Sequence, residues 1–383
     1  LYMLYTGGTT GMPKGVLWRQ HDVFIGAMGG IPWGQAEPFE SVAAVAEASK
    51  NGGAAMMTAA PLMHGAAQWM CFTAFTNGNT VVLPYPADRF DPATLLSTME
   101  RERVLTLQIV GDAFARPLVE ELAAHDYDLS GFMVLSNGGA AMHPSVKERF
   151  FELVPQAMII DAIGSSETGG QMGSTTTKDN AGTGSFAPGN DTVVVNAAMD
   201  AVLSPGSEEV GWLARRGYVP LGYLGDADKT RRTFPEIDGV RYSVPGDRVL
   251  WRADGSIEFF GRESATINSG GEKIFAEEVE LAVGSHPAVS DVMVVGRPSE
   301  RWGSEVVAII TVSDPSVTDD AILAEAALHI ARYKLPKAIV RRAELKRSPA
   351  GKADYRWAKE QAQTPEPEAD HPQSTSSTAG DPA

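Results

Sequence analysis

Residues 5–15 are Tyr5-Thr6-Gly7-Gly8-Thr9-Thr10-Gly11-Met12-Pro13-Lys14-Gly15, and they follow the short apolar run 1–4. Glycines let backbone N–H groups converge on an anion, threonine hydroxyls add neutral donors, and Lys14 adds a positive charge. This combination suits the triphosphate of a nucleotide. It differs from the Walker A loop, which ends in Gly-Lys-Ser or Gly-Lys-Thr, because Pro13 precedes the lysine and Gly15 follows it. The stretch predicts a phosphate site directly after a strand.

Downstream of this loop, as far as about residue 187, apolar runs of strand length alternate with segments of helical spacing. Pro92 and Pro144 lie near two of the expected helix starts, where proline is tolerated. Such alternation is typical of an α/β fold with a largely parallel sheet covered by helices. The expected strands are Thr80–Leu83, Thr106–Val110, Phe132–Leu135 and Met158–Ile160, and the expected helices are Asp91–Arg103, Ala115–His125 and His143–Leu153.

The pattern changes after residue 188. Residues 189–261 hold short β runs separated by Gly, Pro and Asp, which predict a small β subdomain within a large domain 1–261. Residues 262–360 predict a small α+β C-terminal domain. Residues 361–383 are rich in Pro, Ser, Thr and Glu and lack aromatic residues, so we expect a disordered tail. The C-terminal elements expected are the helices Glu277–Val283 and Asp319–Tyr333 and the strands Val289–Val295 and Val306–Thr311.

Composition narrows the class of protein. The chain has 383 residues and a formal net charge of −16, which argues against nucleic acid as a partner because non-specific binding needs a basic surface. Its one cysteine, Cys71, excludes a disulfide framework and a multi-cysteine metal site. We see neither a membrane-spanning apolar stretch nor a signal peptide, and we expect a cytoplasmic protein. Because the sequence starts at Leu1, we also expect that it is partial.

Five further segments with functional residue types stand in order down the chain. They are Pro61-Leu62-Met63-His64-Gly65, Ser136-Asn137-Gly138-Gly139-Ala140, Gly164-Ser165-Ser166-Glu167-Thr168, the series Gly246-Asp247, Asp254-Gly255 and Gly261-Arg262, and Ser348-Pro349-Ala350-Gly351-Lys352. Together with residues 5–15 they resemble, in the same order, the motifs of the adenylate-forming (AMP-binding) superfamily. That superfamily includes acyl-CoA synthetases, firefly luciferases and peptide-synthetase adenylation domains.

The resemblance implies an acyl-CoA synthetase that uses ATP to form an acyl adenylate and passes the acyl group to coenzyme A. Lys352, Glu167 and Thr6 would be its catalytic residues. Glu167 would also bind Mg²⁺, a cation that prefers carboxylate and phosphate oxygens. Asp247 would accept hydrogen bonds from both ribose hydroxyls. The implied nucleotide and coenzyme A contacts are Thr6, Gly7, Gly8, Thr9, Thr10, Lys14, Gly138, Gly139, Ala140, Gly164, Ser165, Ser166, Asp247, Arg262, Gly270, Gly271 and Lys352.

The acyl pocket is less well defined by the residues themselves. The resemblance implies His64 and Trp69 as substrate contacts, but a histidine packed in a core is an equal alternative, and Trp69 is more often a core residue. Two positions depart from the family pattern. Ile163 stands where an aromatic residue often stacks on adenine, and Ser264 stands at a hinge position that is often charged.

The substrate class also rests on resemblance. Residues 261–280 and Met12–Arg19 are most similar to actinobacterial acyl-CoA synthetases for fatty and steroid side-chain acids, in which Gly270 and Gly271 would flank the pantetheine tunnel. The implied partners are a small carboxylic acid, ATP and coenzyme A, and a homodimer is left open. Two alternatives remain: an enzyme that loads the acyl group on a carrier protein, and an inactive fragment, because the family has a substantial portion before the phosphate loop.

Overall fold

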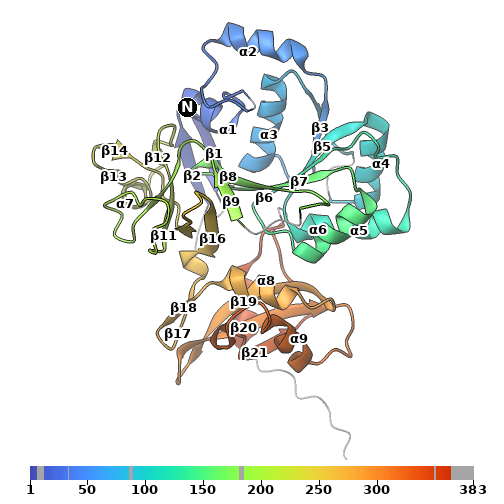
Figure 1. Ribbon diagram of the computed structural model, residues 1–383, viewed down its shortest axis with the longest axis vertical. Coiled ribbons are helices and arrows are strands. Elements are labelled where there is room, and N and C mark those ends of the chain that lie inside the picture. The colour runs from blue at the N-terminus through green and yellow to red at the C-terminus, as the bar shows by residue number, and fades with distance from the viewer. Residues whose placement is uncertain (7–12, 33, 86–88, 181–184, 349–350, 364–383) are drawn as a thin grey trace, which may run out of the picture.

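The computed structural model describes residues 1–6, 13–32, 34–85, 89–180, 185–348 and 351–363. Figure 1 shows an upper lobe, which extends to the end of strand β16 (Ile257–Arg262), and a lower lobe built from the residues that follow. Within the described ranges, no helix is both long enough and apolar enough to cross a membrane.

One sheet runs through the upper lobe in the strand order β10-β11-β15-β16-β9-β8-β7-β6-β5-β3-β4. From β4 to β7 neighbouring strands are parallel, which confirms the α/β prediction. The four expected strands are present, and most of their ends lie within three residues of the expected positions. The strands are β3 (Ala55–Thr58), β4 (Thr80–Val82), β5 (Val104–Ile109), β6 (Val134–Gly138) and β7 (Met158–Ser165). The helices of this region are α3 (Gly65–Thr76), α4 (Pro92–Glu102), α5 (Asp112–Ala124) and α6 (Pro144–Leu153).

The expected β subdomain is an antiparallel continuation of the same sheet. Both of its faces are apolar: Val193, Val195 and Ala214 lie in one core cluster, and Val194, Leu213 and Val249 lie in another. A strand buried on both faces can therefore extend the sheet instead of forming a separate one. The strands of this subdomain are β10 (Thr192–Val195), β11 (Gly211–Arg215) and β15 (Asp247–Trp251), together with β16. The antiparallel part of the sheet starts before the expected subdomain, with β8 (Gly169–Thr176) and β9 (Ser185–Pro188). Helix α7 (Ala227–Thr233) and the hairpin of β13 (Glu236–Ile237) and β14 (Val240–Arg241) complete the region.

A second, small sheet frames the predicted phosphate loop. Strands β1 (Tyr2–Thr6) and β2 (Lys14–Trp18) are antiparallel, and Thr6 is paired with Lys14 where the loop leaves and re-enters the sheet. The short strand β12 (Gly222–Tyr223) pairs with the other edge of β2. Gly7, Gly8, Thr9 and Thr10 lie outside the described residues. Helices α1 (Gln20–Ala27) and α2 (Val42–Ala48) and the 3₁₀ turn η1 (Ser49–Asn51) follow.

The lower lobe packs helices on both faces of the sheet β19-β20-β21. Its strands are β17 (Ile267–Ser269), β18 (Glu272–Ile274), β19 (Val289–Ser299), β20 (Gly303–Val312) and β21 (Ala338–Arg341). Its helices are α8 (Ala276–Gly284), α9 (Asp319–Ala326) and α10 (Tyr355–Gln363), with the 3₁₀ turns η2 (Glu263–Ala265) and η3 (Arg332–Lys334). The domain boundary at residue 262 stays a prediction.

Two C-terminal expectations need correction. The helix expected over Asp319–Tyr333 ends at Ala326, because the chain then turns to bury Ile330 and enters η3 before Pro336, which disfavours helix in the preceding residue. The expected tail begins later than residue 361, because α10 continues to Gln363 and buries Ala362. Residues 364–383 lie outside the described part of the chain.

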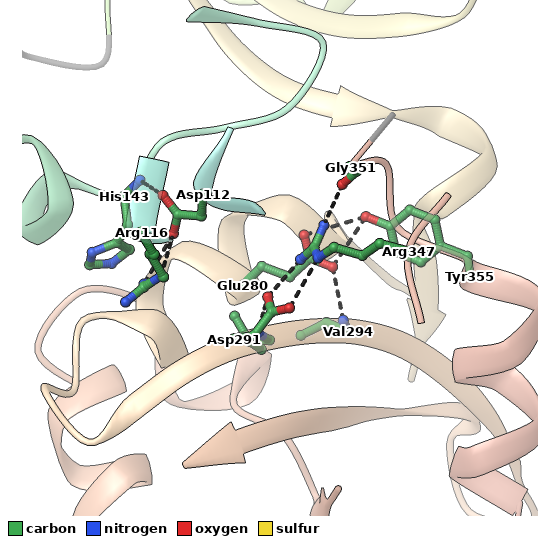
Figure 2. A network of polar contacts seen from close by, with 10 residues as sticks. Asp112, Arg116, His143, Glu280, Asp291, Val294, Arg347, Gly351 and Tyr355 are labelled. Atoms are coloured by element: carbon green, nitrogen blue, oxygen red, sulfur yellow. Dashed lines mark hydrogen bonds and ion pairs between the residues drawn. The ribbon is translucent and has the colours of Figure 1, made fainter. Parts of the chain in front are cut away.

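A partly buried acid, Glu280, lies between three elements of the lower lobe. The carboxyl oxygen Oε1 of Glu280 accepts hydrogen bonds from the Val294 backbone N–H (2.9 Å) and the Tyr355 hydroxyl (3.1 Å), as Figure 2 shows. Burial raises the pKa of Glu280 from 4.5 to about 8, and nearby Glu277 adds to the shift. Glu280 therefore joins α8, β19 and α10 as a neutral group near pH 7.

This shift predicts how stability varies with pH. The unfolded carboxyl ionises near pH 4.5, whereas in the folded protein it stays protonated to about pH 8. Unfolding therefore releases a proton between these values, so rising pH lowers the free energy of unfolding across this window. Glu280→Gln keeps an acceptor but cannot titrate. We expect the difference between wild type and variant in denaturant midpoints to change steadily from pH 5 to pH 8, and parallel curves would contradict the assignment.

Candidate active site

Glu167 lies in the tight turn between β7 and β8, at the point where the parallel half of the sheet meets the antiparallel half. It is 6% exposed. The turn is shaped by local contacts: the Glu167 N–H donates to Ser165 Oγ (3.2 Å), and the Ser165 N–H donates to Thr168 Oγ1 (3.0 Å). Gly164 is needed here, because a Cβ would lie 2.2 Å from the Gly169 carbonyl oxygen.

Residues remote in sequence fix this buried acid. The Tyr223 hydroxyl donates to Glu167 Oε1 (2.7 Å), and the Ser243 hydroxyl donates to the Glu167 carbonyl oxygen (2.7 Å). The Trp18 indole N–H donates to the Ser166 carbonyl oxygen (3.0 Å). Burial and the charge of Glu167 raise the pKa of Tyr223, so its hydroxyl remains a donor. The donors set the position of Glu167 before any ligand binds.

Lysine side chains lie at Tyr223 and at the start of β2. The Lys229 ammonium lies 4.2 Å from the centre of the Tyr223 ring, a cation–π contact. Lys14 forms an ion pair with Asp226, which also caps α7 by accepting from the Lys229 N–H (2.9 Å). Loss of water lowers the pKa of Lys229, and the negative charge of Glu167 opposes the shift. Among the described residues, Lys229 has no carboxylate partner within ion-pair distance, so its charge is available to an anion.

Asp247 and Arg262 lie opposite each other on β15 and β16. Asp247 is 4% exposed, and its Oδ1 is 3.2 Å from Arg262 Nε. Burial raises the pKa of Asp247 and Arg262 opposes this, while Asp247 raises the pKa of Arg262. The first turn of α8 closes on the same point: Glu277 Oε1 accepts from the Arg262 N–H (3.3 Å), and a Cβ on Gly261 would lie 2.3 Å from Glu277 Oε2. The predicted hinge is therefore in contact with the lower lobe.

The Gly138–Ala140 turn lies at the carboxyl end of β6. Asn137 braces it, because its amide N–H donates to the Ala140 carbonyl oxygen (3.2 Å) and its Oδ1 accepts from the Gly111 N–H (2.7 Å). Gly139 has φ +88°, and a Cβ there would lie 3.7 Å from Lys352 Cε. A lysine of the lower lobe thus lies against the Gly138–Ala140 turn of the upper lobe, whose residues are among the implied nucleotide contacts.

Lys352 is exposed but crowded on one side by charged groups. Removal of water lowers the pKa of its ammonium group, the charge of Arg262 lowers it further, and Glu167 opposes the shift. Burial, and then the charge of Lys352, lower the pKa of His64, the residue before α3. Lys352 therefore interacts electrostatically with Arg262, Glu167 and His64, although these residues come from distant parts of the sequence.

Other predicted residues lie elsewhere. Trp69 packs edge-on against Trp18, with ring centres 6.5 Å apart, beside a small core that includes Val16. Ile163 packs against a core cluster of the sheet and Ser264 lies in η2. Gly270 and Gly271 form the turn of the β17–β18 hairpin, at the left of the lower lobe in Figure 1. Among the described contacts, none joins this hairpin to Glu167, Asp247 or Lys352.

Sequence reasoning missed Tyr223, Lys229, Ser243 and Glu277. Spacing could not reveal Tyr223 and Ser243, because their partner Glu167 lies 56 and 76 residues away in the chain. Glu277 and Lys229 have closer partners, but neither lies in the six ordered motifs. Trp18 lies within Met12–Arg19, a segment that supports the family resemblance, but the sequence alone indicates no role for it. Its contact with Ser166 depends on the pairing of β1 with β2, which carries the indole to the turn after β7.

Comparison with known proteins agrees with this geometry. Residues 1–224 match the family model described as AMP-binding enzyme, and residues 278–352 match the AMP-binding enzyme C-terminal domain. The chain is 55% identical over 364 residues to a medium-chain acyl-CoA ligase of Mycobacterium avium, and 42% identical over 370 residues to a 3-oxocholest-4-en-26-oate–CoA ligase of Rhodococcus rhodochrous. Each comparison covers 94% of this chain and 66% of the relative's length.

Solved structures share the fold. ATP-bound MatB from Rhodopseudomonas palustris superposes with a TM-score of 0.74 at 19% identity, covering 94% of this chain and 67% of that one. An o-succinylbenzoate CoA synthetase from Bacillus subtilis, in complex with its acyl-adenylate intermediate, gives a TM-score of 0.72 at 23% identity, covering 95% of this chain and 69% of that one. With both family models matched in order over most of its length, the chain belongs to the family of AMP-binding enzymes.

Proposed function

We propose that this protein is an ATP-dependent acyl-CoA synthetase, which converts a fatty or steroid side-chain carboxylic acid to acyl-AMP and then to acyl-CoA. The observation that carries the proposal is the position of Lys352 beside Gly139, within the electrostatic reach of Glu167 and Arg262. The names of the two relatives support the substrate class. A cytoplasmic location and a homodimer stay predictions.

In the first half-reaction, the acid's carboxylate attacks the α-phosphate of ATP, and pyrophosphate leaves. Asp247 would accept the ribose hydroxyls, and the Gly138–Ala140 turn would receive the adenine. The Lys352 ammonium would offset negative charge that builds between the carboxylate and the α-phosphate. Lys14, which is paired with Asp226, and Lys229, which lies over the Tyr223 ring, are suited to the departing phosphates.

Glu167 fits a magnesium ion. The described residues contain no cluster of three or more His, Cys, Asp or Glu that could hold a metal. Mg²⁺ is commonly bound by one or two carboxylates and completed by phosphates and water, so a single buried acid suffices. Bound Mg²⁺ would neutralise phosphate charge. Tyr223 would orient the carboxylate through Oε1.

In the second half-reaction, the coenzyme A thiolate attacks the acyl carbon and AMP leaves. Lys352 occupies the side of the site facing the lower lobe, so we propose that this lobe rotates about the Gly261–Arg262 region and brings the Gly270–Gly271 turn to the site. A carrier protein is the alternative acceptor, and thioester formation with free CoASH distinguishes the two.

Glu167→Gln removes the charge of the proposed metal ligand while preserving its size. We expect ATP–pyrophosphate exchange to fall more than about tenfold, with greater demand for Mg²⁺. Glu236→Gln is the matched control, because Glu236 is exposed on β13 and should leave exchange unchanged. Exchange at the wild-type rate in Glu167→Gln would remove Glu167 from the site.

The two half-reactions should separate by mutation. Lys352→Ala should lower acyl-AMP formation about 100-fold or more, yet leave thioester formation from supplied acyl-AMP and CoASH near the wild-type rate. Gly271→Leu should do the opposite. Gly271→Ala controls for the strain that any side chain suffers at φ +91°, and the exposed Lys337→Ala controls for loss of charge. If Lys352→Ala slowed both steps equally, the two-conformation mechanism would be wrong. These assays use the full-length protein.

The proposed substrate class has its own test. We expect full-length enzyme to form more acyl-CoA per minute from a medium-chain fatty acid or a steroid side-chain acid than from acetate. A hydrophobic pocket gains roughly 0.8 kcal/mol for each buried CH₂ group, so the preference should grow with apolar size. A panel of acids in which acetate is the best substrate would refute this assignment.

A further inference from the structure

The turn that carries Lys352 is closed by its own backbone. The Ser348 N–H donates to the Lys352 carbonyl oxygen (2.8 Å), and the Lys352 N–H donates back to Ser348 Oγ (3.2 Å). Arg347 and Ala353 form a β-bridge at its base. These contacts tie Arg347 and Ser348 to Lys352 and Ala353, so whatever holds Arg347 also constrains the place of Lys352.

Arg347 holds this turn to the sheet of the lower lobe. Its guanidinium makes two contacts with the Asp291 carboxylate on β19, Nε–Oδ2 at 3.0 Å and Nη2–Oδ1 at 2.6 Å. Its remaining nitrogen, Nη1, donates to the carbonyl oxygen of Gly351 (3.0 Å). This carbonyl belongs to the peptide bond between Gly351 and Lys352. Figure 2 shows these contacts converging on one side chain. The planar guanidinium thus fixes the Gly351–Lys352 peptide relative to β19.

The opposite side of the turn fits closely against the upper lobe. Gly351 has φ +74°, and a Cβ on it would lie 3.0 Å from Phe114 Cε2 and 3.2 Å from the Val110 carbonyl oxygen. The turn therefore lies between a fixed arginine and the start of α5, with little free space. A displacement of its backbone moves the Lys352 ammonium directly, and misplacement by about 1 Å can cost about 100-fold in rate.

We propose that Arg347 is a positioning residue for the adenylation step, which acts through the Gly351 carbonyl to place the Lys352 ammonium. The inference rests on the proposed function of Lys352. It does not extend to thioester formation, in which Lys352 has left the site. Arg347 should therefore affect one half-reaction, whereas a residue that only stabilises the lower lobe should affect both alike.

The same lobe contains a matched control. Arg297 also binds one carboxylate and one backbone carbonyl: Nε and Nη2 contact Glu305 Oε1 (2.9 and 2.6 Å), and Nη1 contacts the Ala362 oxygen (3.0 Å). Both arginine side chains are 21–30% exposed. Arg297 holds α10 instead of the Lys352 turn. Arg347→Gln and Arg297→Gln thus remove equivalent interactions with different predicted consequences.

The experiment measures both half-reactions, and the unfolding midpoint, in full-length protein. We expect Arg347→Gln to lower kcat for acyl-AMP formation more than about tenfold, with smaller changes in KM for ATP, and to leave thioester formation from supplied acyl-AMP near the wild-type rate. Arg297→Gln should lose similar stability but keep both rates. Arg347→Lys keeps the positive charge beside Asp291 but lacks the planar guanidinium that contacts Asp291 and Gly351 together. It should therefore fold and still show the adenylation defect.

The outcomes separate the two proposals. Wild-type adenylation in both Arg347 variants, or equal losses in both half-reactions that Arg297→Gln reproduces, would overturn the positioning role. If Arg347→Gln fails to fold, Arg347→Lys decides the question alone. If the wild type forms acyl-AMP but no thioester with CoASH, the acyl-CoA synthetase assignment fails, while a loss of acyl-AMP formation in Arg347→Lys that Arg297→Gln does not share still supports the positioning role.

Discussion

A carboxylate buried in a turn between two strands constrains much of the upper lobe. Burying an ionised acid without donors is costly, so Glu167 and its turn must be supplied with hydrogen bonds from elsewhere. The donors come from distant segments: Trp18 at the end of β2, Tyr223 in β12, and Ser243 before β15. Arg215, on β11, adds a contact to the Thr168 carbonyl oxygen. The small β1-β2-β12 sheet and the antiparallel half of the large sheet are thereby fixed around one acid.

Cations then collect around this acid, although the whole protein is strongly negative. Arg262 is paired with Asp247, and Lys14 with Asp226, whereas Lys229 and Lys352 have no ion-pair partner among the described residues. The pKa values of both unpaired lysines are lowered mainly by loss of water. A partly desolvated cation gains most from an anionic ligand, so the charge pattern favours a polyphosphate over a neutral ligand.

The elements with clear periodicity could be predicted from the sequence. The parallel strands and helices α4, α5 and α6 were found because each buries a regular apolar pattern, and Pro92 and Pro144 mark true first turns. Long-range contacts could not be predicted: nothing in the order of residues links Tyr223 to Glu167 or Arg347 to Asp291. The expected helix end at Tyr333 and the expected tail start at residue 361 were wrong for a related reason, because both depend on tertiary burial, of Ile330 and Ala362 respectively. The motif order placed Glu167, Asp247 and Lys352 together, but not the residues that hold them.

The strand order also has a consequence for folding on the ribosome. Strand β9 (185–188) gains its second neighbour only when β16 (257–262) has been made. Strand β12 completes the small β1-β2-β12 sheet roughly two hundred residues after β2. Pairings this remote in sequence form slowly, because a long loop must close before any contact forms. The parallel strands can assemble early, while β9 waits with an open edge. That edge is open to chaperone binding or aggregation until β16, the last strand of the upper lobe, emerges.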